Sequence, residues 1–183
     1  MEMDDPLEVL TALALDGPAP YLVRRLQQHV TAIFSEEMEG YDITGPQYGT
    51  LAVVVAYPNL DQNTTAFLAG VERTTMVGVI NRLVKSGLLK RTTSKSDKRL
   101  RLLQPTEAGI RFVHKVRGSV QRMSTRLLDP LPAEQRAALC ETMRELLRDR
   151  VRKEATQLRD WAQIRQLLSR TDLPLSSTKR RPR

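Results

Sequence analysis

The chain has 183 residues, of which 40% are hydrophobic and 4% aromatic, and it carries a formal net charge of +8. This length allows one domain with a substantial core, and the hydrophobic fraction is too high for a disordered chain. The positive charge favours an acidic partner, either nucleic acid or an anionic surface, and the single cysteine excludes an intramolecular disulfide framework.

The sequence predicts a cytoplasmic, nucleoid-associated protein with no membrane partner. Its first residues, Met-Glu-Met-Asp-Asp, lack the positive start and apolar run of a signal peptide. The apolar stretch at residues 51–57 is far shorter than the roughly 20 residues that a membrane span needs.

Two helices are predicted in the first forty residues. The first covers residues 5–16, where Asp5 can cap it, Pro6 suits its first position and Glu8 completes a capping box. Its apolar stripe would be costly if exposed, so we expect it to pack on a partner subunit. The second covers residues 19–38, and its apolar side is expected to be buried: Leu22, Leu26, Val30, Ile33 and Phe34.

Capping residues mark the next two helices. Thr44, with Gln47 three residues later, predicts a helix that runs to about Tyr57. Asp61 begins a shorter helix, which ends at Gly70.

Residues 73–86 predict an amphipathic helix, which Gly87 can end in the left-handed conformation. Four apolar residues share one face: Met76, Val79, Ile80 and Leu83. The opposite face carries Thr74, Val77, Gly78 and Asn81, flanked by Arg73, Arg82 and Lys85.

A basic hairpin is predicted after this helix, with strands at residues 88–92 and 99–104 and its tip at residues 93–98. From residue 73 to residue 101 the chain has nine basic residues and one acidic residue, Asp97. A helix with a polar face followed by a basic hairpin suits the major groove of DNA and the phosphates beside it. An ordinary solvated helix and hairpin is the alternative, because charged runs usually face water.

Helices are also predicted after the hairpin. Thr106 caps one that runs to about residue 128, and another starts near Ala133. Residues 151–170 continue a helical pattern, which either prolongs this helix or folds back, and Trp161 is expected in a core or interface. Residues 171–183 are expected to be a basic, disordered tail that adds phosphate attraction.

Short motifs in this order carry a resemblance to a known family. They are Gly70-Val71-Glu72-Arg73-Thr74-Thr75, Asn81-Arg82-Leu83, Ser86-Gly87-Leu88, Asp97-Lys98-Arg99 and Thr106-Glu107-Ala108-Gly109. The segment that contains them resembles the MarR family of winged helix-turn-helix regulators, and with its flanking helices the resemblance covers residues 18–150.

The resemblance implies a mostly α fold with a small β-hairpin wing, a winged helix-turn-helix that is dimeric and has extra N- and C-terminal helices. Four segments follow from it. They are the N-terminal dimerisation helices bordering a pocket (1–43), the DNA-binding domain (44–105), the C-terminal dimerisation helices (106–170) and the basic tail (171–183).

The resemblance also implies a homodimer on double-stranded DNA, with residues 73–86 in the major groove and the wing in the minor groove. Bases would be faced by Arg73, Thr74, Thr75, Val77 and Asn81. Phosphates would be contacted by Arg82, Lys85, Lys95 and Lys98, and the minor groove by Arg99, with Asp97 orienting the wing.

A small-molecule effector is a further implication, because members of the family often respond to aromatic carboxylates and some to coenzyme A thioesters. Tyr21, Arg25, His29 and Tyr48 are candidates for stacking on the effector and pairing with its charge. The alternative for each is an ordinary surface or core residue.

No motif predicts catalysis, a metal site or a cofactor. The two histidines, His29 and His114, are far apart, and no glycine-rich phosphate loop or Cys/His cluster occurs. Cys140 is interpreted as a small hydrophobic residue rather than a redox sensor. Two other functions stay open, a non-sensing architectural DNA-binding protein and a protein-interaction module built on a winged helix.

Overall fold

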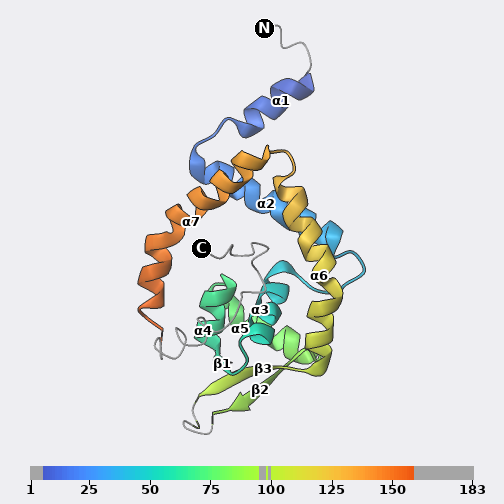
Figure 1. The fold of residues 1–183 in the computed structure, drawn as a ribbon, viewed down its shortest axis with the longest axis vertical. Coiled ribbons are helices and arrows are strands. Elements are labelled where there is room, and N and C mark those ends of the chain that lie inside the picture. The colour runs from blue at the N-terminus through green and yellow to red at the C-terminus, as the bar shows by residue number, and fades with distance from the viewer. Residues whose placement is uncertain (1–5, 95–97, 99, 159–183) are drawn as a thin grey trace, which may run out of the picture.

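The structure is a computed structural model, and it describes residues 6–94, 98 and 100–158 (Figure 1). The helices in chain order are α1 (Pro6–Leu15), α2 (Ala19–Glu37), α3 (Gly45–Ala56), α4 (Gln62–Ala69), α5 (Arg73–Lys85), α6 (Glu107–Leu128) and α7 (Ala133–Ala155). The strands are β1 (Leu60–Asp61), β2 (Leu89–Thr93) and β3 (Arg101–Pro105). This mostly helical architecture with a small sheet confirms the predicted fold class.

The predicted capping residues begin their helices as expected. The Thr44 hydroxyl accepts a hydrogen bond from the Gln47 amide, and the Gln47 side chain accepts one from the Thr44 amide at 2.9 Å. Asp61 accepts hydrogen bonds from the amides of Asn63 and Thr64 at 2.7 and 3.1 Å. These bonds satisfy amides that have no partner within the helix. The predicted Asp5 cap lies outside the described residues.

The wing belongs to a sheet larger than the predicted hairpin. β3 pairs antiparallel with β2 on one side and with β1 on the other, where Leu60 lies opposite Leu103. β1 has two residues, which are too few to show the alternating pattern by which a strand is predicted from sequence. β3 begins at Arg101 rather than at the predicted residue 99.

The core lies between α3, α5, the sheet and the first half of α6. Leu51 and Val54 of α3 are fully buried, as are Met76 and Ile80 of α5. Leu103 of β3 and Val116 of α6 close the same cluster. The helix-turn-helix and the wing are therefore built on one common core.

The start of α6 is locked to the end of α5. Gly87 ends α5 with a φ of +70°, and its carbonyl accepts a hydrogen bond from the Thr106 hydroxyl at 2.6 Å. The Thr106 amide donates to the Leu88 carbonyl at 3.1 Å. Gly109 lies so close to this carbonyl that a Cβ at position 109 would overlap the Leu88 oxygen.

An ion-pair cluster joins α2 to the second half of α6. Glu37 accepts hydrogen bonds from Arg122 at 2.7 Å and from Arg126 at 3.0 Å, and Arg126 also reaches Glu36 at 2.5 Å. The hydrogen bonds from Arg126 and Arg122 lower the pKa of Glu37 below its ordinary value of 4.5. We call α2 and the paired half of α6 the arm. Figure 1 shows the arm above α3, α4, α5 and the sheet, the unit that the sequence predicts to bind DNA.

Part of the predicted buried stripe on α2 is exposed within one chain. Ile33 and Phe34 are buried, as predicted, but Leu22 and Leu26 are each 40% exposed. On α7, Leu146 is 77% exposed. The prediction that Leu22 and Leu26 are buried is wrong for a single chain, because the buried residues of α2, Ile33 and Phe34, lie only near its C-terminal end.

Among the described residues no helix is both long enough and apolar enough to cross a membrane.

We expect Gly109→Ala to lower the free energy of unfolding by about 1–3 kcal/mol, because the added methyl group must displace backbone. Gly118→Ala is the matched control in the same helix, since its Cβ would meet only the end of Arg122 at 3.5 Å. The free energy of unfolding of Gly118→Ala should rise by about 0.5–1 kcal/mol, because alanine has a higher helix propensity than glycine. Urea unfolding followed by circular dichroism compares them, and a Gly109→Ala protein as stable as the wild type would contradict the close approach.

The lowered pKa of Glu37 predicts a pH dependence of stability. A carboxyl whose pKa is lower in the folded state stabilises the fold above its unfolded pKa, and this contribution is lost as pH falls through the folded pKa. In thermal melts between pH 7 and pH 3, the melting temperature should fall less with decreasing pH for Glu37→Gln than for the wild type. Glu39→Gln is the control, because it removes a carboxylate that forms no ion pair with the described residues, and its melting temperature should depend on pH as the wild type's does. The same pH dependence in all three proteins would refute the role of the Glu37 ion pairs.

Candidate nucleic-acid interface

Helices α4 and α5 form a helix-turn-helix at the surface of the molecule. Gly70 ends α4 in the left-handed conformation, with a φ of +63°. The Val71 amide donates to the Ala66 carbonyl at 3.0 Å, and two residues later α5 begins at Arg73. The turn is short because glycine adopts this conformation without the strain that a side chain would bring.

The two faces of α5 differ as the sequence predicted. Its apolar face is buried, with Met76 and Ile80 fully covered, Leu83 2% exposed and Val79 7% exposed. The opposite face carries exposed residues along the whole helix: Thr74, Val77, Gly78 and Asn81. An exposed helix face of this kind has the width to enter the major groove of duplex DNA.

Gly78 makes the centre of the exposed face flat. A Cβ at this position would have no atom within 4 Å, so packing does not require a glycine here. Val77 beside it is 47% exposed. A glycine in the middle of a helix weakens it, but it lets another molecule approach the backbone closely.

Basic side chains surround this face. Arg73 lies at the start of α5, and Arg82 and Lys85 lie in its second half, all of them exposed. From the adjacent β2, the Arg91 guanidinium donates a hydrogen bond to the Asn81 side-chain oxygen at 2.6 Å. The sequence did not point to this role for Arg91, because the two residues are ten positions apart and meet only through the turn at Gly87.

The wing extends beside the helix. The Arg101 guanidinium donates a hydrogen bond to the Thr93 hydroxyl, across the β2–β3 pair. Lys98 is exposed in the turn. Lys95, Asp97 and Arg99, which the sequence predicted at the wing tip, lie outside the described residues.

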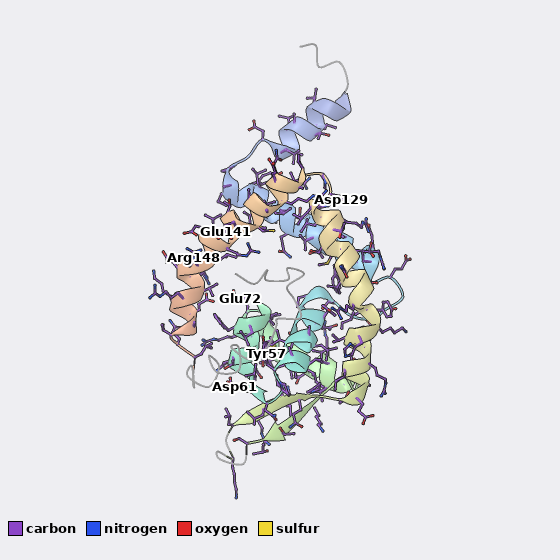
Figure 2. The ribbon with its side chains drawn as sticks, in the orientation of Figure 1. Tyr57, Asp61, Glu72, Asp129, Glu141 and Arg148 are labelled. Atoms are coloured by element: carbon purple, nitrogen blue, oxygen red, sulfur yellow. The ribbon has the colours of Figure 1, made fainter. Side chains whose placement is uncertain are left out.

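A small hollow of about 350 Å³ lies at the start of α5. Its lining includes Asp61 and Asn63 from the start of α4, Arg73 of α5 and Leu100 at the base of the wing. Gln157 and Leu158, which follow α7, complete it. Figure 2 labels Asp61 before α4 and Glu72 before α5, where the two helices begin.

The four predicted effector residues do not share one site. Arg25 and His29 line a hollow of about 550 Å³ along α2, together with Leu15, Leu22, Leu26 and Gln28. Tyr21 is outside this lining, and its hydroxyl donates to the Ala14 carbonyl at 3.0 Å. Tyr48 is 9% exposed in the core, with its ring centre 6.3 Å from that of Phe34, and burial raises the pKa of its hydroxyl.

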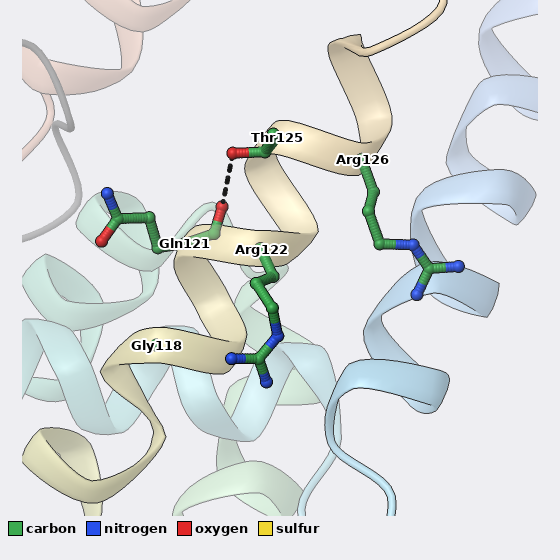
Figure 3. A pocket seen from close by; sticks show the side chains of 5 residues that line it. All are labelled: Gly118, Gln121, Arg122, Thr125 and Arg126. Atoms are coloured by element: carbon green, nitrogen blue, oxygen red, sulfur yellow. Dashed lines mark hydrogen bonds between the residues drawn. The ribbon is translucent and has the colours of Figure 1, made fainter.

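A second hollow, of about 290 Å³, lies on α6 and is lined by Gly118, Gln121, Arg122, Thr125 and Arg126 (Figure 3). The guanidinium groups of Arg122 and Arg126 extend toward α2, where they pair with Glu36 and Glu37. Their charges are already compensated, so this hollow has less to offer an anionic ligand than the one beside Arg25.

Within the part of the chain that the structure describes, no three His, Cys, Asp or Glu side chains gather where they could hold a metal ion. Cys140 is half-buried on α7.

Comparison with known proteins identifies relatives of this chain. Residues 41–100 match a family model described as the MarR family. A putative transcriptional regulatory protein for the hcr operon of Thauera aromatica is 30% identical over 58% of this chain and 64% of that protein.

Two solved structures give the likeness in three dimensions. The PcaV transcriptional regulator of Streptomyces coelicolor, in complex with its natural ligand, is 33% identical, with a TM-score of 0.67, over 72% of this chain and 93% of that one. The transcriptional repressor CouR, bound to a 23-mer DNA duplex, is 25% identical, with a TM-score of 0.65, over 80% of this chain and 97% of that one. More than a quarter of this chain therefore has no counterpart in PcaV.

Proposed function

Because the chain belongs to the MarR family of transcriptional regulators, we propose that it is a homodimeric repressor that an aromatic carboxylate, or its coenzyme A thioester, releases from DNA. The observation that carries the proposal is the exposed face of α5, which has a buried apolar face behind it and basic side chains around it. CouR, a relative with the same fold, has been solved on duplex DNA.

On DNA, α5 lies in the major groove. Thr74, Thr75 and Asn81 face base edges, and Val77 contacts a thymine methyl group where Gly78 allows close approach. Arg73, at the start of the helix, also faces bases. The phosphates on either side are contacted by Arg82, Lys85, Lys95 and Lys98, and the minor groove by Arg99.

The Arg91–Asn81 hydrogen bond has two consequences in this arrangement. It holds the Asn81 carboxamide in one orientation, with its oxygen accepting from Arg91 and its amino group free to donate to a base. It also brings a positive charge from β2 to the edge of the major groove.

A second copy of the chain covers the exposed apolar positions of α1 and of the arm. Leu10, Leu13, Leu22 and Leu26 of α1 and α2 are at least 40% exposed, which is unfavourable for a monomer in water. A two-fold axis through the arms would present two α5 helices to successive major grooves about 34–36 Å apart. The operator is then a pseudo-palindrome.

The hollow along α2 is the proposed effector site. Leu22 and Leu26 provide an apolar wall for an aromatic ring, and Arg25 provides a guanidinium that can hold a carboxylate through two hydrogen bonds. His29 in the same lining adds a hydrogen-bonding group. PcaV, at 33% identity, has been solved with its natural ligand, which supports the proposal of a ligand site in this chain.

The arm connects this site to the DNA-binding unit. Glu36 and Glu37 of α2 pair with α6, and α6 is locked at its other end to Gly87 after α5. A ligand that binds best when the two arms adopt a different spacing shifts the population toward dimers whose α5 helices no longer match the operator.

The first test is fluorescence anisotropy of the protein on the duplex upstream of its own gene, with excess random duplex present. We expect nanomolar binding that survives the competitor and falls when one member of a panel of aromatic acids and their thioesters is added. Binding that the competitor abolishes would instead favour an architectural DNA-binding protein. A shallow salt dependence would favour a protein-interaction module.

Replacing the base-reading side chain should change specificity. We expect Asn81→Ala to cost about 1–3 kcal/mol on the operator and to relax the preference at one base-pair position in each half-site. Arg91→Ala should lose part of the same preference, since it frees the Asn81 carboxamide. Arg111→Ala on α6, which also removes one positive charge, is the control for Arg91→Ala. If the Asn81→Ala protein retains the wild-type preference at every position, Asn81 does not read a base.

Arg25→Ala should separate effector response from DNA binding. The variant keeps its operator affinity, but it needs at least about tenfold more aromatic acid for release, because one charge-assisted pair is lost. Arg24→Ala is the matched control, since this neighbouring arginine is exposed and does not line the hollow. Titration of the preformed protein–DNA complex with the acid measures release for both variants. If the two variants are released at equal concentrations of the acid, the effector binds elsewhere.

A further inference from the structure

The last described residues of the chain are buried again after an exposed stretch of α7. The apolar residues in the second half of this helix, Leu146, Leu147 and Val151, are 44–77% exposed. By contrast, Ala155 and Leu158 are only 6% and 8% exposed. We call residues 155–158, which are the last residue of α7 and the turn after it, the end of α7. This end makes a contact that the turns before it do not make.

The direction of α7 is set at its start by Arg136. The Arg136 guanidinium donates hydrogen bonds to the carbonyls of Leu131 and Asp129 at 2.7 and 3.1 Å, and it pairs with the Asp129 carboxylate at 3.4 Å. These bonds close the turn between α6 and α7, where Figure 2 labels Asp129. From this turn α7 runs to the side of α4 and β1, opposite α6 (Figure 1). With 23 residues it is about 34 Å long, so it spans the distance from the arm to the DNA-binding unit.

The end of α7 lies where the helix-turn-helix and the wing meet. Gln157 and Leu158 share the hollow of about 350 Å³ with Asn63 at the start of α4, Arg73 at the start of α5 and Leu100 at the base of the wing. Asn63 and Arg73 are both exposed. In a helix-turn-helix on DNA, the first helix crosses the phosphate backbone and the start of the second faces base edges. The end of α7 therefore lies beside two residues that the bound duplex would approach.

The hollow also shows that this contact is loosely packed. Side chains that line an empty space lose part of the dispersion energy that a filled core provides. Within the end of α7, Ala155 and Leu158 are buried, but Thr156 and Gln157 are exposed. A contact this small can be displaced by a molecule that binds the same surface more strongly.

We propose that the end of α7 is an autoinhibitory element, which covers the start of α5 and must move away before the helix-turn-helix binds DNA. Leu158 holds the docked state, because it is the apolar side chain buried beside Arg73. While the end of α7 is docked, Arg73 and Asn63 cannot reach a duplex, so the apparent affinity for DNA falls in proportion to the undocked fraction. The inference rests on the proposed function, since it requires a protein that binds DNA.

Docking and DNA binding exclude each other in this scheme, so each weakens the other to the same extent. A substitution that weakens docking tightens DNA binding, and bound DNA undocks the end of α7. A merely structural role of Leu158 predicts the opposite sign, because a destabilised protein binds DNA less tightly. The direction of the change in affinity therefore separates the two roles.

The test replaces Leu158 by glutamine in the full chain, which removes apolar burial and leaves the net charge unchanged. Leu146→Gln is the matched control, because it makes the same substitution at a position of α7 that is 77% exposed. Anisotropy titrations on the duplex upstream of the protein's own gene and on a random duplex of equal length give the affinity of each protein. Circular dichroism compares the folding of the two variants with that of the wild type.

We expect Leu158→Gln to bind both duplexes about three- to thirtyfold more tightly than the wild type, because the undocked fraction rises. Leu146→Gln should bind as the wild type does. An affinity of Leu158→Gln equal to or below that of the wild type would overturn the inference, as would an equal gain in the control. If neither the wild type nor Leu158→Gln binds any duplex, the proposed function fails instead, so the two failures are distinguishable.

Hydrogen exchange of the wild-type protein tests the same contact without a substitution. The amides of Gln157 and Leu158 donate to the carbonyls of Glu154 and Ala155 at 3.1 and 3.2 Å, and docking protects this turn. Saturation with the random duplex should speed exchange at residues 155–158 by about threefold or more, and leave exchange at residues 140–148 unchanged. Unchanged or slower exchange at the end of α7 would show that it stays docked on DNA, and the inference would be wrong.

Discussion

The packing of the apolar face of α5 against α3 decides what this protein presents to its partner. Met76, Ile80 and Leu83 are buried in the common core, so the residues on the other side of the helix must face outward. One residue of slip would turn the helix by about 100° and bury Asn81 or expose Ile80. Everything proposed for DNA recognition depends on this orientation, which burial of apolar surface fixes more firmly than any surface hydrogen bond does.

The second constraint is the close backbone approach where α5, the sheet and α6 meet. Gly87 turns the chain, Thr106 bonds to its carbonyl, and Gly109 leaves room for the Leu88 carbonyl. Since this junction is tight, α6 cannot tilt without moving the end of α5. The ion pairs of Glu36 and Glu37 hold the far end of α6, so a change in the arm has a continuous physical route to α5.

The end of α7 lies against the starts of α4 and α5. Its burial beside Arg73 connects the arm to the DNA-binding unit a second time, on the side opposite α6.

The sequence by itself determined the helices and the two faces of α5, because the signals involved are local. Thr44, Asp61 and Thr106 satisfy amides within three residues of themselves, and the 3.6-residue period of α5 shows its buried side directly. The motifs shared with the MarR family are also short and continuous, so the family and the helix-turn-helix were both evident from the chain alone.

Only the tertiary structure decided the contacts between distant residues. It paired β1 with β3, joined Arg91 to Asn81, left Leu22 and Leu26 exposed within one chain, and brought Leu158 to Arg73. It also separated Tyr48, in the core, from Arg25 and His29 on α2. Such contacts depend on the path of the whole chain, and no local pattern records that path because the partners are ten to more than eighty residues apart.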